Sequence, residues 1–296
     1  MQKSEKPFIS VIVPTFRDWP RLQLCLNCLS QQTYPQRGFE IVVVNNDPED
    51  RPPADLQCPE NCILIEEDGH GSYAARNKAL KVVRGDIVAF TDSDCLPDKQ
   101  WIESAVKIFL SDESISRIGG EVQVFSVEGN SPDIALPYES LFALEQTEFV
   151  KNGAAITANM FTRKEVIEAV GGFDASLKSG GDAEWGYRAQ HAGFSIIFSS
   201  LVRVQHPARS FQELLAKNKR IVGGAYDMAS KKGYVAIAAL YFVTLSPPVF
   251  SIYRAFRTEK LTFVEKLKAI LVKVYLRLIS VGELTKLLFG KTSERS

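Results

Sequence analysis

Short apolar runs alternate with amphipathic stretches over the first hundred residues of the chain. The apolar runs, which predict buried strands, cover residues 8–13, 39–44, 62–65 and 87–90. Between the first two runs, Leu22, Leu26 and Leu29 recur at the spacing of one helical face. A second helix is expected over residues 73–83. This alternation predicts a parallel sheet with crossover helices, whose polar loops gather at one edge.

The run at residues 87–90 ends in Asp92-Ser93-Asp94, two carboxylates one residue apart. Ligands of open α/β sheets bind beyond the carboxyl ends of the strands. Two carboxylates this close repel each other unless a cation or a proton lies between them, and their oxygens suit Mg²⁺ or Mn²⁺. The motif therefore indicates a divalent cation that carries a diphosphate. The alternative is a turn that caps a helix beginning near Lys99.

Six motifs between residues 8 and 206 resemble, in order, those of family 2 glycosyltransferases with the GT-A fold, of the bacterial polysaccharide and glycolipid type. They are VIVPTF (11–16), VVVNND (42–47), GSYAARN (71–77), DSD (92–94), GGFD (171–174) and GDAE (181–184). The resemblance implies an α/β fold with a Rossmann-like, mostly parallel central sheet flanked by helices. It also implies inverting transfer of a sugar from a nucleoside diphosphate sugar, most simply a UDP-sugar, to a hydroxyl of a glycan or lipid-linked acceptor.

The same resemblance implies the residues that bind the nucleotide sugar. They are Pro14, Thr15, Phe16, Asn46, Asp47, Gly71, Arg76, Asp92 and Ser93. Asp47 corresponds to the acidic residue that hydrogen-bonds the base, usually uracil. The family often has Asp-Asp at this point, so Asn46 removes one negative charge. Arg76 would approach the base or the diphosphate, because a guanidinium offers fixed donors to both; the alternative is a helix residue that faces solvent.

Metal ligands are implied at Asp92, Asp94 and His206. His206 ends another apolar run, at residues 202–206, and GT-A enzymes often supply a further ligand from such a position. Imidazole suits Mn²⁺ better than Mg²⁺. The expected cofactor is thus a divalent cation, Mn²⁺ or Mg²⁺. A purely structural role for His206 is the alternative.

Asp182 is the implied catalytic base. Inverting transfer needs a carboxylate that removes the proton of the acceptor hydroxyl, while a cation stabilises the departing diphosphate. The family carries a Glu-Asp pair here, and in this chain Gly181 replaces the Glu. Glu184 is the second candidate for base, or orients acceptor or base, although Arg188 four residues later can pair with it. Asp182 could also cap the helix that follows.

The second half of the chain is expected to build the acceptor side, with strands at residues 118–125 and 156–161 and helices at residues 137–150 and 183–192. The expected organisation is a glycosyltransferase domain at 1–210, divided into a nucleotide-sugar half (1–98) and an acceptor half (99–210), and a helical extension at 211–296.

The helical extension contains residues 233–253, which carry no charge and are long enough in principle to span a bilayer, although Pro247 and Pro248 interrupt them. Residues 261–288 form a basic amphipathic pattern. This pattern favours contact with an anionic membrane surface over packing against the catalytic domain. A transmembrane helix is a further alternative. We expect a cytoplasmic enzyme that lies peripherally on the inner face of the cytoplasmic membrane.

The composition is that of an ordinary enzyme. Its 35 basic and 35 acidic residues balance, so nothing indicates a nucleic acid partner. The five cysteines predict reduced thiols rather than zinc ligands, since Cys25 and Cys28 fall in a predicted helix. Two other function classes stay open. A nucleotidyltransferase would not need the turn and carboxylates at 171–184, and a silent nucleotide-sugar-binding protein would be expected to lose Asp94 or Asp182.

Overall fold

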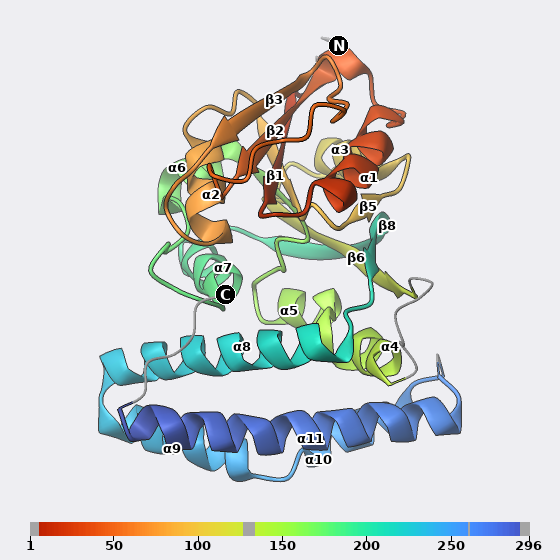
Figure 1. Ribbon diagram of the computed structural model, residues 1–296. Coiled ribbons are helices and arrows are strands. Elements are labelled where there is room, and N and C mark those ends of the chain that lie inside the picture. Colours follow the sequence, from red (N-terminus) through yellow and green to blue (C-terminus); the bar gives the residue numbers. More distant parts are fainter. Residues whose placement is uncertain (1–5, 127–133, 260, 291–296) are drawn as a thin grey trace. The chain divides into compact units, whose positions relative to one another are not determined.

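The computed structural model describes residues 6–126, 134–259 and 261–290 (Figure 1). The chain forms two compact units. Unit 1 comprises residues 1–123, 146–175 and 181–206, and unit 2 comprises residues 124–145, 176–180 and 207–296. Two short segments expected in the acceptor half, 124–145 and 176–180, therefore belong with the C-terminal helices.

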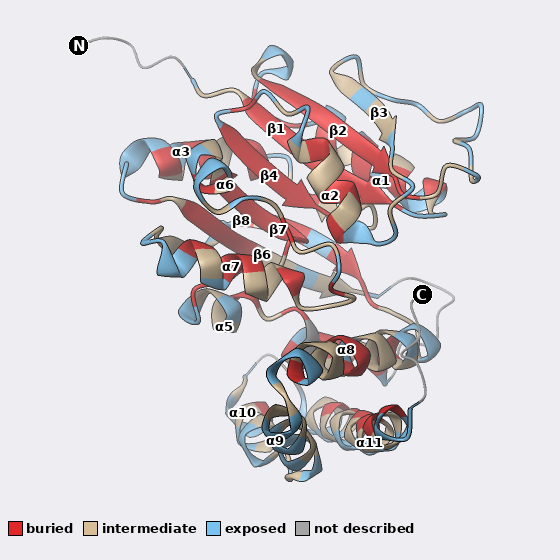
Figure 2. Ribbon diagram, turned by 90° about the vertical axis from the view of Figure 1, so that its left-hand side faces the viewer, coloured by how far each residue is buried: buried red, intermediate tan, exposed pale blue. Residues whose placement is uncertain are grey.

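An eight-stranded sheet is the core of unit 1, in the order β3-β2-β1-β4-β7-β6-β8-β5. Its first half is the predicted parallel arrangement: β1 pairs in parallel with β2 and β4, and β2 with β3. These strands are β1 (Ile9–Thr15), β2 (Phe39–Asn45), β3 (Cys62–Glu66) and β4 (Ile87–Thr91). Every residue of β1, β2 and β4 is buried (Figure 2), which explains why they read as continuous apolar runs.

The second half of the sheet is antiparallel where its pairing is defined. β7 runs antiparallel to β4 and β6, and β5 runs antiparallel to β8, so the sheet as a whole is mixed. The strands are β5 (Leu96–Pro97), β6 (Arg117–Phe125), β7 (Asn159–Arg163) and β8 (Ile196–Pro207). The reversal at β4 and β7 places Thr91 opposite Asn159. The acidic motif that directly follows β4 therefore begins at the same end of this strand pair as the segment that precedes β7.

Helices flank this sheet. They are α1 (Trp19–Ser30), α2 (Ser72–Leu80), α3 (Trp101–Ser111), α5 (Gln146–Lys151), α6 (Lys164–Val170) and α7 (Gly181–His191), with the short η1 (Gln36–Gly38). In α1, the predicted apolar face is buried to within 1% at Leu22, Leu26 and Leu29. All five cysteines are free thiols, as predicted, and Cys25 and Cys95 are buried.

The single helix expected over residues 137–150 is wrong. The segment instead forms α4 (Ala135–Tyr138), a π-helical turn η2 (Glu139–Ala143) and α5. Two buried side chains explain the break. Glu139 is bound by the backbone N–H and guanidinium of Arg209 within unit 2, whereas Gln146 exchanges hydrogen bonds with the backbone of Ile156 within unit 1. Because each end of the segment has its own tertiary partners, a continuous helix cannot form.

Unit 2 is helical. Besides α4 it contains α8 (Phe211–Lys232), α9 (Tyr234–Leu245), α10 (Val249–Arg257) and α11 (Phe263–Leu288). Capping boxes at Ser210 with Glu213 and at Thr262 with Glu265 fix where α8 and α11 begin. Figure 1 shows α8 and α11 side by side, and the apolar residues between them include Leu214, Val272 and Leu276.

The uncharged stretch forms α9 and α10, which are bent by 45° at the break that contains both prolines. Pro248 cannot donate a helical hydrogen bond, and Pro247 disfavours helical geometry at Ser246. Within the described ranges, no single helix is long and apolar enough to cross a membrane, and only this bent pair passes that test when taken together.

Candidate active site

Asp92, just beyond β4, is held by Arg76 of α2. The Arg76 Nη2 atom lies 2.6 Å from Asp92 Oδ1, and only 3% of Arg76 is exposed. The alternative of a solvent-facing Arg76 is therefore wrong. A buried guanidinium fixed by one carboxylate still has donors to offer to a phosphate or a base edge. Its Nε atom is buried and has no hydrogen-bond partner within the part of the chain that the structure describes.

Asp94 lies beside His206 rather than with Asp92. His206 Nε2 is 3.4 Å from Asp94 Oδ2, and the imidazole is buried at 1% exposure. These two groups and the Cys95 sulfur have ligand atoms within 4.8 Å of one another, a grouping that leaves out Asp92. Burial, together with the neighbouring Asp94 and Asp92 carboxylates, raises the pKa of the Cys95 thiol. Within this group, Asp94 and His206 offer the oxygen and nitrogen donors that suit a cation such as Mn²⁺.

Asn46 organises the glycine loop before α2. Its amide nitrogen donates to the backbone oxygens of Glu67 and Gly69 at 3.0 and 2.6 Å, and its amide oxygen accepts from the Gly71 N–H at 2.9 Å. A carboxylate has no N–H to donate, so the Asn in place of the family's Asp has a structural reason here. Gly71 has φ +100°, a value that favours glycine, and begins α2.

Asp47, the expected partner of the base, is bound by Arg17. The Arg17 Nε atom lies 2.5 Å from Asp47 Oδ2. This hydrogen bond, with the charge of Arg17, lowers the pKa of Asp47. Arg17 has φ +52° and lies over the ring of Phe16, which is itself half exposed. Asp47 is therefore a carboxylate at neutral pH.

Among the described residues, three buried polar atoms along this edge of unit 1 have no hydrogen-bond partner: Thr15 Oγ1, Thr91 Oγ1 and Arg76 Nε. Thr15 and Thr91 end β1 and β4. Buried polar groups normally have partners, so unpaired ones at the carboxyl ends of strands are typical of a place where a ligand binds. Pro14 is buried next to Thr15, while Ser93 is partly exposed beside Asp92.

Asp182 does not cap its own helix. Tyr73 of α2 donates its phenol hydrogen to Asp182 Oδ1 at 2.5 Å, and Thr157 donates both its N–H and its hydroxyl to Oδ2 at 3.0 Å. Burial, reinforced by the Asp182 carboxylate, raises the pKa of Tyr73, so the phenol keeps the proton that it donates. The phenol oxygen in turn accepts the Gly181 N–H at 2.9 Å. Asp182 is thus fixed by donors from two distant segments.

Gly181 has no room for a side chain. A Cβ at this position would lie 2.7 Å from the ring of Tyr73. Replacement of the family's Glu by Gly therefore lets the Tyr73 ring approach the first turn of α7. The contact with Tyr73 thus explains why this chain has Gly where the family has Glu.

Glu184 is engaged by Arg188. The guanidinium contacts both carboxylate oxygens, at 2.7 and 3.0 Å, and also donates to the backbone oxygens of Val170 and Gly172. This pair anchors α7 to the turn at residues 171–174. The predicted pairing with Arg188 is confirmed, and it engages both carboxylate oxygens of Glu184.

Asn77 joins the helix of the glycine motif to the same turn. Its amide donates to the Phe173 oxygen at 2.7 Å and accepts from the Phe173 N–H at 2.8 Å. The Phe173 ring packs against Tyr73, Phe90 and Trp185. Neither the role of Asn77 nor that of Tyr73 was predicted, and the only signal in the sequence was their place in the motif at 71–77.

α2 therefore connects the two halves of the site. Tyr73 and Arg76 lie three residues apart on this helix, and they bind Asp182 and Asp92 respectively. Residues at this spacing share one helical face. The structure thus brings the expected base and the end of β4 to one turn of a helix, while Asp94 and His206 form a separate pair.

Comparison with known proteins identifies the family of the chain. Residues 10–171 match the model of the family described as "Glycosyl transferase family 2". The chain is 39% identical over 227 residues to glycosyltransferase AglE of Haloferax volcanii, covering 75% of this chain and 74% of that protein.

Two solved structures share the fold. The mannosyltransferase PcManGT from Pyrobaculum calidifontis, in complex with GDP-Man and Mn²⁺, is similar with a TM-score of 0.59 and 20% identity, over 97% of this chain and 75% of that one. TarS 1-349 from S. aureus, in complex with UDP-GlcNAc, has a TM-score of 0.52 and 20% identity, over 92% and 73%. Since the family model covers more than half of the sequence and AglE is a relative at 39% identity, the chain belongs to glycosyltransferase family 2 and is a glycosyltransferase with the GT-A fold.

Proposed function

We propose that the enzyme transfers a sugar from a UDP-sugar to a hydroxyl of a glycan or lipid-linked acceptor, with inversion, and that Asp182 is the base. The observation that carries this proposal is the linkage through α2. Tyr73 fixes Asp182, and Arg76, three residues later, fixes Asp92 at the end of β4. An inverting enzyme must hold its base and its donor close together, because the acceptor oxygen attacks while it loses its proton.

Asp182 is oriented for such a step. Tyr73 occupies one acceptor site on Oδ1, and the N–H and hydroxyl of Thr157 occupy two on Oδ2, whereas a carboxylate has about four lone-pair sites in all. The remaining capacity accepts the hydroxyl proton. As the acceptor oxygen bonds to the anomeric carbon, the bond from that carbon to the diphosphate breaks, and the diphosphate leaves with the electron pair.

Arg76 and the Asp94–His206 pair serve the diphosphate. Arg76 is buried, positively charged and keeps an unpaired Nε, so it suits an anionic or planar acceptor. Asp94 and His206 would hold a divalent cation, which when bound neutralises charge on the departing diphosphate. That PcManGT was solved with GDP-Man and Mn²⁺ and TarS with UDP-GlcNAc supports a nucleotide sugar here, and Asp47 is the proposed acceptor for the uracil N–H.

Unit 2 is proposed to contact a membrane surface, as suits a lipid-linked acceptor. Large apolar side chains are exposed along α9, α10 and α11, among them Phe242 (73%), Phe250 (71%) and Leu271 (68%). Exposed apolar faces of this size mark interaction surfaces, and basic residues on the same helices favour an anionic one. The location on the inner face of the cytoplasmic membrane stays a prediction.

Calorimetric titration of UDP, GDP and dTDP, with and without Mn²⁺, tests the donor site. We expect UDP to bind with Mn²⁺ and to lose that dependence in Asp94→Asn, while Asp68→Asn, an exposed carboxylate of the preceding loop, keeps it. Tighter binding of GDP than of UDP would overturn the proposed nucleotide. Absence of binding by all three would overturn the donor site itself.

A catalytically silent nucleotide-sugar-binding protein is the second candidate, because the hydrogen bonds to Asp182 could serve structure alone. Release of UDP from UDP-sugars in the presence of acceptor glycans separates the two. Release of UDP that depends on the acceptor supports sugar transfer. If the protein binds UDP-sugars but releases no UDP over a complete panel of UDP-sugars and acceptors, it is a catalytically silent binding protein. A nucleotidyltransferase has no support from the family assignment.

A further inference from the structure

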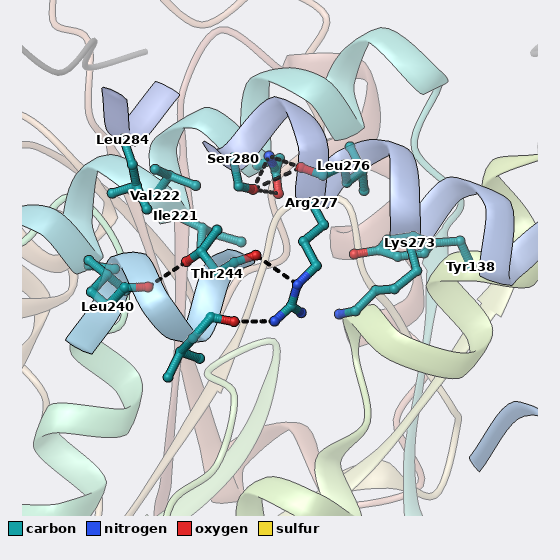
Figure 3. Close-up of a pocket in the computed structure, with 13 residues that line it drawn as sticks. Tyr138, Ile221, Val222, Leu240, Thr244, Lys273, Leu276, Arg277, Ser280 and Leu284 are labelled. Atoms are coloured by element: carbon teal, nitrogen blue, oxygen red, sulfur yellow. Dashed lines mark hydrogen bonds between the residues drawn. The ribbon is translucent and has the colours of Figure 1, made fainter. Parts of the chain in front are cut away.

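Unit 2 encloses a cavity of about 210 Å³ between α8, α9 and α11 (Figure 3). Two cationic side chains of α11, Lys273 and Arg277, line it together with the polar groups of Asn218 and Ser280. The rest of the lining is largely apolar: Tyr138, Ile221, Val222, Leu240, Val243, Leu276 and Leu284. The cavity is smaller than the roughly 300–1,000 Å³ of sites for drug-sized ligands. It therefore suits a small charged group with an apolar attachment.

Lys273 and Arg277 contact carbonyl oxygens and aromatic rings. Arg277 donates from Nε to the Thr244 oxygen at 2.9 Å and from Nη2 to the Val243 oxygen, which are carbonyls at the end of α9. Lys273 lies over the rings of Tyr138 and Phe142, 5.9 and 5.3 Å from their centres. Neither side chain pairs with a carboxylate among the described residues. Figure 3 shows both extending from α11 toward the same space.

The surroundings make the charge of Lys273 costly. Burial, followed by the nearby charges of Arg277 and Arg254, lowers the pKa of Lys273. Glu145, the carboxylate that pairs with Arg254, is already engaged by that arginine. Like charges that are held close together in a partly buried place repel each other, and an anion that binds between them lowers this electrostatic cost. A phosphate group accepts such charge-assisted hydrogen bonds from both Lys and Arg.

The polar groups opposite the cations are already satisfied. Asn218 donates to the Ser280 hydroxyl at 2.9 Å, and Ser280 donates to the Leu276 oxygen at 2.8 Å. They stabilise the contact of α8 with α11 and compete little for a ligand. The anion-binding capacity of the cavity therefore lies in Lys273 and Arg277.

The cavity is continuous with the exposed apolar surface of the unit. Val243 lines the cavity and is 61% exposed, and the neighbouring Phe242 is 73% exposed. On α11, Leu278 follows Arg277 directly and is 67% exposed. A ligand with its charged group at Lys273 and Arg277 can thus extend an apolar chain along residues that are themselves open to a bilayer.

We propose that this cavity binds the phosphate group of a membrane lipid, with Lys273 and Arg277 as its ligands and the lipid chain against Leu240 and Val243. The proposal rests on the membrane contact of unit 2 proposed above, and it specifies the lipid group that unit 2 would bind. It requires a phosphate joined to an apolar chain, because the lining offers both surfaces side by side. Free phosphate would use only the cationic end.

Flotation of the full-length protein with vesicles tests the proposal. Vesicles of phosphatidylcholine with and without phosphatidic acid are compared, using Lys273→Gln and a matched control, Lys266→Gln, on the same helix outside the cavity. A surface lysine near an anionic bilayer contributes about 1 kcal/mol, so the control should lose at most about fivefold in affinity. A lost hydrogen bond to a charged group corresponds to about tenfold or more for Lys273→Gln. Lys273→Arg should restore binding.

The outcomes distinguish binding at the cavity from general attraction to an anionic surface and from binding of free phosphate. Equal losses in Lys273→Gln and Lys266→Gln would reveal general surface attraction and overturn the site. Loss of affinity for inorganic phosphate in Lys273→Gln, together with equal vesicle binding of Lys273→Gln and wild type, would overturn the lipid as ligand. Thermal unfolding of each variant shows that the fold is retained. Nucleotide titration on the wild type tests the donor site independently, so failure of one proposal is distinguishable from failure of the other.

Discussion

The Tyr73 phenol donates a 2.5 Å hydrogen bond to Asp182, across 109 positions of sequence. The same oxygen accepts the N–H of Gly181, and a side chain at Gly181 would collide with the tyrosine ring. The glycine, the tyrosine and the aspartate therefore form one arrangement. The residue that differs from the family's Glu-Asp pattern is the residue that makes the arrangement possible.

Replacement of Tyr73 by Phe tests whether this hydrogen bond positions the base. The ring and its packing against Phe173 stay, while Asp182 loses one donor and Gly181 loses its acceptor. We expect kcat to fall about 10- to 100-fold, since misplacement by an ångström costs that much, with the KM for donor nearly unchanged. Steady-state kinetics measure kcat and KM separately. Tyr187→Phe on the exposed face of α7 is the control.

If Tyr73→Phe instead raises the donor KM and leaves kcat intact, the phenol serves the donor side of α2 and does not position Asp182. Unfolding experiments in urea detect a mere loss of stability, which would lower the amount of active enzyme without changing kcat per folded molecule.

Asp182→Asn removes the base while it keeps the shape of the side chain. Transfer should fall about 10²- to 10⁴-fold, the usual contribution of general base catalysis. The amide still accepts from Tyr73 or Thr157, so binding of UDP should be retained. Single-turnover transfer and calorimetry on the same preparation measure both quantities. Transfer at the wild-type rate would show that Asp182 is not the base.

The parallel half of the sheet could be predicted because its strands are buried on both faces. β1, β2 and β4 contain no exposed residue, so they read as uninterrupted apolar runs. The antiparallel half could not be predicted in the same way. β8, for example, has partly exposed or exposed residues over its first five positions, and its partners lie far away in the sequence.

The candidate site was only partly predictable for a similar reason. Motifs located Asp92, Asp94 and Asp182, but local patterns contain no information on what each carboxylate meets after folding. Arg76 pairs with Asp92, and His206 lies near Asp94, so the two carboxylates of one motif have different partners. The helix expected over 137–150 failed because tertiary hydrogen bonds of Glu139 and Gln146 outweigh local helix propensity.

Asn46→Asp is expected to damage the glycine loop, although it restores the family's usual residue. The carboxylate cannot donate to the oxygens of Glu67 and Gly69, and it brings negative charge toward both. Loss of such buried hydrogen bonds costs about 1–3 kcal/mol each. We expect weaker UDP binding and faster proteolysis in the loop.

Asn152→Asp is a matched control, since Asn152 is exposed and donates to a single carbonyl. Calorimetry measures the UDP affinity of both variants, and limited proteolysis measures how fast the loop is cleaved in each. Unchanged UDP affinity in Asn46→Asp would mean that the conformation of the loop does not depend on this amide.

Glu40 should make the stability of the protein dependent on acid pH. Its carboxylate accepts hydrogen bonds from the Ser10 hydroxyl at 2.6 Å and from the backbone N–H and guanidinium of Arg84, both at 2.8 Å. Burial opposes ionisation of Glu40, but these hydrogen bonds and the charge of Arg84 outweigh it and lower its pKa below the usual 4.5. Because the pKa is lower in the folded state, the carboxylate stabilises the fold fully above pH 4.5, and this stabilisation is lost as pH falls through the folded pKa.

Glu40→Gln removes the ionisable group while it keeps the shape of the side chain. Urea unfolding at pH 7 should show a loss of about 1–3 kcal/mol, the cost of disrupting buried hydrogen bonds to a charged group. At pH 3 the difference between Glu40→Gln and wild type should shrink, since below pH 4.5 the unfolded state binds a proton that the folded carboxylate resists. Glu165→Gln is the control, because Glu165 lies exposed in the first turn of α6. A constant difference between Glu40→Gln and wild type from pH 7 to pH 3 would show that shape and packing, rather than the charge of Glu40, determine its contribution.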